Sequence, residues 1–159
     1  MTRSMLGLAG WLLVSFAAAG IGSRYMPGAW YASLVKPTWN PPAAVFAPVW
    51  TVLYTAMGVA AWLVWRRAGF AGAGAALRLF LLQLAINALW SYLFFGAHRP
   101  DLAFFDIVAL WLAILAVMLL FWRVDWRAGA LMVPYLMWVG FASVLNFVLW
   151  RLNGGQPGR

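Results

Sequence analysis

Amides and aromatic rings recur at helical spacing inside the most apolar parts of the chain. One stripe consists of Gln83, Asn87, Trp90 and Phe94. Residues three and four apart lie on the same side of a helix, so these side chains share one face. An amide at membrane depth is costly unless it finds a hydrogen-bond partner. The stripe therefore predicts either polar contacts between helices, which the pattern alone favours, or the lining of a binding site.

Two further segments carry aromatic faces that are interrupted by small residues. Both faces repeat every four residues: Trp50, Tyr54 and Gly58 in one segment, and Trp138, Ala142 and Asn146 in the other. Small residues allow helices to pack closely, and they can also leave a slot beside an aromatic ring. The faces predict close helix packing or a binding slot for a flat aromatic ligand.

Metal and thiol chemistry is disfavoured by the residues present. The chain has no cysteine, and its single histidine, His98, stands beside Arg99 and Pro100. We therefore expect no metal site and no required cofactor. Asp106 is the one acid within an apolar run, and we expect it near the headgroups, paired with Arg99 or favoured by a helix N-terminus.

The composition excludes a water-soluble domain. Hydrophobic residues make up 66% of the 159 residues, and only three residues are acidic. A soluble surface needs far more polar side chains than this. The formal net charge is +8, but the basic residues are dispersed one or two per loop, which argues against binding of nucleic acid. We expect a multi-pass integral membrane protein whose surroundings are the lipid bilayer.

Five apolar runs are long enough to cross a bilayer, which takes about 20 helical residues. They cover residues 5–22, 45–65, 76–97, 102–122 and 129–150. Backbone groups in lipid must bond internally, and the runs lack the alternation of barrel strands, so helices are expected. The sequence predicts an all-α, five-helix transmembrane bundle that forms one domain over residues 1–159. The first run also resembles a cleavable signal peptide, but four further spans favour an uncleaved helix.

The connection between the first two runs, residues 23–42, is long and aromatic. Its composition predicts a segment that folds back onto the bundle rather than a solvated linker. Asn40 is a good N-cap and Pro41 suits a first helical position, so the next helix should start at Pro41 or Pro42. Pro48 and Pro134 fall inside predicted spans, where each should bend its helix, and bent helices can leave a cavity.

Several segments carry a family resemblance. WYASLVKPTWNPP, continued by AAVFAPVWTVLY, is similar to the signature of the TspO/MBR family, which includes tryptophan-rich sensory proteins, the translocator protein and the peripheral benzodiazepine receptor. LQLAINALWSYLFFG and VPYLMWVGFASVLNFVLWRLN resemble the third and fifth helices of that family. The resemblance covers residues 5–153 and implies a five-helix bundle, often dimeric, in a bacterial cell envelope, with a first loop that covers a porphyrin pocket.

The resemblance also implies site residues. Trp50 and Trp138 match the tryptophans implicated in the ligand pocket and porphyrin chemistry of the family, and they would be the catalytic residues of an enzyme. The other matching positions are Tyr31, Trp39, Pro41, Tyr54, Asn87, Trp90, Ala142 and Asn146. The proposed cholesterol motif needs a tyrosine where this chain has Phe147 before Arg151, so cholesterol is not expected as the natural ligand.

Three functions remain open from the sequence. The leading hypothesis is a sensor or transporter that binds protoporphyrin IX, with the macrocycle stacked on Trp50 and Trp138 and its propionates near Lys36 or Arg24. Asn87 would position the ring, and no axial iron ligand is evident, which favours metal-free porphyrin over haem. The alternatives are a light-dependent porphyrin-degrading enzyme and a structural membrane subunit without a small ligand.

Overall fold

The computed structural model describes residues 2–154, and the regular elements in this part of the chain are all helices. The elements are α1 (Arg3–Gly22), α2 (Ala29–Ser33), α3 (Ala43–Ser91), the π-helix η1 (Tyr92–Gly96), α4 (Pro100–Val124) and α5 (Trp126–Leu152). Four helices are long and apolar enough to cross a membrane: α1, α3 with η1, α4 and α5. The predicted all-α class is confirmed for these residues. A single domain over residues 1–159 stays a prediction, since residues 1 and 155–159 lie outside the described part.

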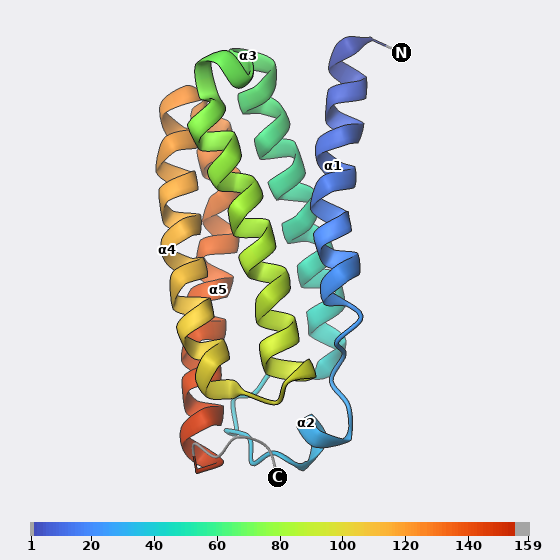
Figure 1. Cartoon of the computed structure of the whole chain (residues 1–159), viewed down its shortest axis with the longest axis vertical. Helices are drawn as coiled ribbons and strands as arrows, with labels where there is room; N and C mark the ends of the chain where they lie inside the picture. Colours follow the sequence, from blue (N-terminus) through green and yellow to red (C-terminus); the bar gives the residue numbers. More distant parts are fainter. Residues whose placement is uncertain (1, 155–159) are drawn as a thin grey trace.

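The longest helix, α3, reverses direction part-way along its length. Gly69 has φ 59° and ψ −172°, and Ala73 has φ −129° and ψ 22°, so neither residue is helical. The φ of Gly69 lies in the left-handed region, which glycine adopts readily. Figure 1 shows the two arms of α3, drawn in teal and green, running beside each other. The run predicted at 45–65 thus lies on the first arm. The run predicted at 76–97 lies on the second arm and continues through η1.

The start of α3 differs from the prediction. The helix begins at Ala43 instead of Pro41 or Pro42, and Pro42 occupies the N-cap without a side-chain hydrogen bond. The Asn40 side chain is engaged elsewhere: its Oδ1 accepts from the Tyr31 hydroxyl at 3.3 Å, and its Nδ2 donates to the Pro41 carbonyl at 3.2 Å. The predicted Asn40 cap is wrong because this side chain bonds within the connection.

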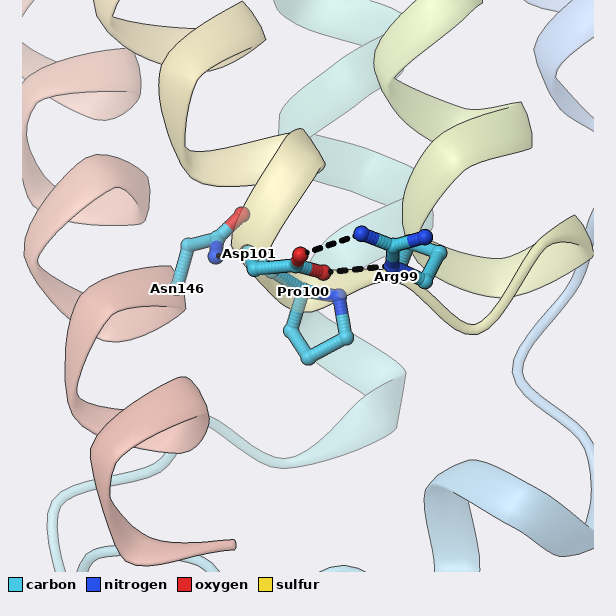
Figure 2. A network of polar contacts seen from close by, with 4 residues as sticks. All are labelled: Arg99, Pro100, Asp101 and Asn146. Atoms are coloured by element: carbon cyan, nitrogen blue, oxygen red, sulfur yellow. Dashed lines mark hydrogen bonds and ion pairs between the residues drawn. The ribbon is translucent and has the colours of Figure 1, made fainter. Parts of the chain in front are cut away.

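The expected pairing of Asp106 with Arg99 is also wrong. Asp101 holds the Arg99 guanidinium through two hydrogen bonds, of 2.8 and 2.6 Å, at the start of α4 (Figure 2). Asp101 lies only two residues from Arg99 and can accept both bonds at once. This contact raises the pKa of Arg99 above its ordinary value. Asp106 is left with a buried Oδ2 that has no partner among the described residues.

The core lies among the two arms of α3, α4 and α5, while α1 packs chiefly on the first arm of α3. The α1–α3 contact depends on the missing side chain of Gly58. A Cβ there would lie 2.8 Å from Leu12 Cδ2 and 3.1 Å from the Leu12 Cα. Backbones of membrane helices approach this closely only where a small residue stands at the contact.

Replacement of Gly58 should therefore loosen α1. We expect Gly58→Ala to destabilise the protein by about 1–3 kcal/mol, because the added methyl group overlaps Leu12. Gly10→Ala is the matched control in α1, since a Cβ there meets nothing within 4 Å. Thermal unfolding in detergent, followed by near-ultraviolet circular dichroism, measures both variants. Equal midpoints for the two variants would contradict the close contact.

Candidate functional site

An open apolar groove of about 610 Å³ lies between the first arm of α3 and α5. Its lining comes in equal parts from the two helices: Pro48, Val49, Val52 and Leu53 on α3, and Pro134, Met137, Trp138 and Phe141 on α5. The volume falls within the range of about 300–1,000 Å³ that is usual for small-molecule sites. Both prolines that the sequence placed inside spans lie on its walls.

Aromatic rings extend from this groove to the connection between α1 and α3. The Trp138 ring lies 6.0 Å from the Phe46 ring and 5.6 Å from the Phe141 ring. Trp39, in the connection, meets Phe141 edge-on with ring centres 5.8 Å apart. The connection therefore contacts the bundle at the wall of the groove.

Trp50 lies in a different environment from Trp138. It is not among the residues that line the groove, and its ring packs at 5.6 Å from Tyr54 and 6.3 Å from Tyr135. Within residues 2–154 no aromatic pair joins Trp50 to Trp138 directly. The two tryptophans matched by the family resemblance thus lie in different places. Trp138 lines the groove, whereas Trp50 packs on the buried rings of Tyr54 and Tyr135.

Those phenol rings belong to a buried hydrogen-bonded network. The Tyr54 hydroxyl donates to Asn87 Oδ1 at 2.9 Å, Asn87 Nδ2 donates to the Tyr135 oxygen at 2.6 Å, and the Tyr135 hydroxyl donates to Gln83 Oε1 at 2.9 Å. Gln83 Nε2 lies 3.7 Å from the sulfur of Met57. All of these side chains are buried. The network joins both arms of α3 to α5, so the two amides act as contacts between helices.

A second polar contact involves Asn146 on α5. Trp90 Nε1 donates to Asn146 Oδ1 at 2.9 Å, and Asn146 Nδ2 donates to the Pro100 carbonyl at 2.8 Å. Figure 2 shows Asn146 on α5 reaching toward the start of α4. Ala142, one turn earlier, is half-buried and packs against the core. Asn146 thus ties the end of the second arm of α3 and the start of α4 to α5.

The η1 segment is the surface on which α2 rests. Tyr31 packs edge-on to Phe94 and Phe95, with ring centres 6.3 and 5.5 Å away. Trp30 stacks on His98 at 4.4 Å with the ring planes 9° apart. His98 has φ 55°, a left-handed conformation that is uncommon for residues other than glycine. The connection is therefore docked onto the end of the bundle by aromatic contacts.

The charged groups near the connection are few. The Lys36 ammonium lies 4.7 Å above the Tyr31 ring and donates to the Leu34 carbonyl at 3.1 Å. Arg24 is exposed, and Pro41 is half-buried. Within residues 2–154 no group of three or more acidic, histidine or cysteine side chains is placed to hold a metal ion.

A model of the TspO/MBR family matches residues 5–151. The chain belongs to the TspO/MBR family. It is 43% identical over 148 residues to "Protein CrtK" of Rhodobacter capsulatus, covering 90% of this chain and 91% of that protein. It is 43% identical to the "Tryptophan-rich sensory protein" of Cereibacter sphaeroides, covering 89% and 87%, and 38% identical to the human "Translocator protein", covering 94% and 91%. The resemblance inferred from the sequence is confirmed.

Several residues of this TspO/MBR chain were missed by the sequence analysis, among them Phe141 and Asn153. Phe141 follows Trp138 by one helical turn, so the same periodicity that identified Trp138 could have included it. Asn153, at the end of α5, bonds to the backbone of Val35 in the connection. No local pattern in the sequence marks a contact between residues so far apart.

The buried network makes Tyr135 essential for stability. We expect Tyr135→Phe to cost about 1–3 kcal/mol, because Asn87 Nδ2 and Gln83 Oε1 lose their partner in a buried site. Tyr92→Phe is the control, since Tyr92 is 44% exposed and lies outside the network. Chemical unfolding in detergent compares the two. A Tyr135→Phe variant as stable as Tyr92→Phe would contradict the network.

Proposed function

We propose that this TspO-family protein crosses the membrane five times and binds a flat tetrapyrrole, with protoporphyrin IX as the ligand to test, in the groove between α3 and α5. The observation that carries this proposal is the apolar groove of about 610 Å³ with Trp138 and Phe141 on one wall. A planar macrocycle buries its faces best against such rings. Binding is the step that a sensing role and a transport role would share.

Five crossings are supported by the length and charges of α3. With η1 the element spans 54 residues, about twice the length of one crossing, which needs roughly 20 to 25 residues. Arg66, Arg67 and Arg78 are exposed and flank the turn at residues 69–73. Arginines are stable at a membrane surface and costly at its centre, so the turn would lie in the interface. The two arms would then cross separately.

The buried network supports a preformed site. Tyr135 on α5 is bonded to Asn87 and Gln83 on the second arm of α3, and Asn87 is bonded to Tyr54 on the first arm. The groove walls belong to α5 and the first arm. Walls that are already fixed do not have to be ordered when a ligand enters, which improves affinity. The propionates of the ligand would pair with Lys36 or Arg24, because a carboxylate forms a stronger bond with an ammonium than the Leu34 carbonyl does.

Quenching of tryptophan fluorescence by protoporphyrin IX, titrated in darkness, tests the site. We expect Trp138→Phe to weaken binding about 2- to 10-fold, because one aromatic contact contributes about 0.5–1.5 kcal/mol. Trp126→Phe is the matched control, since Trp126 is 61% exposed at the first residue of α5 and does not line the groove. Trp50→Phe should have a smaller effect than Trp138→Phe, because Trp50 does not line the groove.

The same titration separates the alternatives. Equal affinity in the Trp138→Phe and Trp126→Phe variants would place the ligand elsewhere. A wild-type protein without saturable quenching would match a structural subunit that has no small ligand. A parallel illuminated sample tests for enzymatic breakdown: loss of porphyrin absorbance that needs light and Trp138, with binding retained in the variant, would favour a degrading enzyme.

A further inference from the structure

Arginines gather at the end of the bundle that lies opposite the connection. In Figure 1 the start of α1, the turn of α3 and the junction of α4 with α5 lie together at this end. We call residues 3–7, 62–78 and 122–127 the basic end. Its arginines are all exposed, namely Arg3, Arg66, Arg67, Arg78, Arg123 and Arg127. The one acid in these three ranges is Asp125, so the basic end carries a clear excess of positive charge.

Asp125 does not neutralise the arginines around it. Its Oδ1 accepts from the Arg127 N–H at 2.9 Å, and its Oδ2 lies 3.6 Å from Arg67 Nη1. By comparison, Asp101 at the opposite end holds Arg99 through two hydrogen bonds of 2.8 and 2.6 Å. The Arg67 side chain is 67% exposed, so its N–H donors remain accessible to an anion. The Asp125 carboxylate therefore brings α3 and α5 together and leaves the positive charge in excess.

Aromatic rings hold two of the guanidinium groups at the surface. The Arg66 guanidinium lies 4.4 Å above the Trp62 ring, and that of Arg127 lies 5.6 Å above the Trp126 ring. Trp62 is itself fixed, because its Nε1 donates to the Ser4 carbonyl at 2.9 Å. A guanidinium group on a ring face keeps N–H donors for the oxygens of a phosphate. Contacts from α1 and α3 thus preorganise Arg66 for an anion.

The apolar side chains of the basic end indicate a lipid surface as the partner. Trp126, Phe70 and Trp122 are 61%, 53% and 48% exposed. Exposed tryptophan rings are typical of the interface between headgroups and acyl chains, where the ring is buried in lipid and its N–H stays near water. The apolar spans begin directly beside these rings, so phospholipid headgroups are the anions that this end meets.

We propose that the basic end binds the phosphate groups of anionic phospholipids, with Arg66, Arg67 and Arg127 as its main contacts. The inference does not depend on a porphyrin, because the groove is lined by other residues. A bound headgroup would link the turn of α3 to the start of α5, the two segments that Asp125 already brings together.

Native mass spectrometry of the full chain released from detergent micelles tests the lipid preference. Phosphatidylglycerol is the anionic probe, and phosphatidylcholine with the same acyl chains is the neutral control. We expect the apparent Kd of phosphatidylglycerol to be lower by about fivefold or more, because one arginine near an anionic surface contributes roughly this factor. A higher ammonium acetate concentration should reduce the difference, since exposed charges are screened. Equal affinity for the two lipids would overturn the proposal.

Matched variants locate the site. We expect Arg66→Gln to weaken phosphatidylglycerol binding about fivefold and to leave phosphatidylcholine binding unchanged, because one charge is removed. Arg151→Gln is the control, since it removes an exposed arginine from the last turn of α5 at the other end, and its effect should be less than about twofold. Thermal unfolding should be close to that of the wild type in both variants, because the side chains are exposed. Equal weakening by Arg66→Gln and Arg151→Gln would show a general charge effect and would overturn the site.

Discussion

The walls of the groove are held by the buried bonds among Tyr54, Asn87, Tyr135 and Gln83. Lipid and an apolar core offer no water, so these groups must satisfy one another. Their geometry brings three helical segments together: both arms of α3 and α5. Association of apolar helices in lipid has no hydrophobic driving force of its own, and polar contacts and close packing decide which faces meet. The groove lies between two of the segments that this network joins.

The aromatic residues of the site surround this network. Trp50 covers the phenol rings, Trp138 and Phe141 form a wall of the groove, and Trp39 brings the connection to that wall. At the end of the bundle, Asn146 holds the start of α4, and η1 supports α2 through its aromatic rings. The hydroxyl and amide groups of the network are paired with one another in the buried interior, whereas the connection is tied to the end of α5 through the exposed hydrogen bonds of Asn153.

Much of this arrangement could be predicted from the sequence because it depends on periodicity. Runs of apolar residues predicted the helices, and spacings of three and four placed Gln83, Asn87 and Trp90 on one face. The partners of these amides could not be predicted, since Tyr135 lies about 50 residues away on another helix. Asn40 was assigned as a cap from its local position, but a tertiary bond to Tyr31 took its side chain. The Asn153 contact was missed for the same reason, because residue pairs distant in sequence leave no local pattern.

The location of a bound porphyrin tests the central claim most directly. A structure of the complex with protoporphyrin IX, determined in the dark, is predicted to show the macrocycle between Pro48 and Pro134 with one face against Trp138, and Tyr135 still bonded to Asn87 and Gln83. The chain offers a second, smaller hollow of about 200 Å³, lined by Val108, Trp111, Gly140 and Ser143 between α4 and α5. Porphyrin in that hollow, or outside the bundle with the groove empty, would contradict the account.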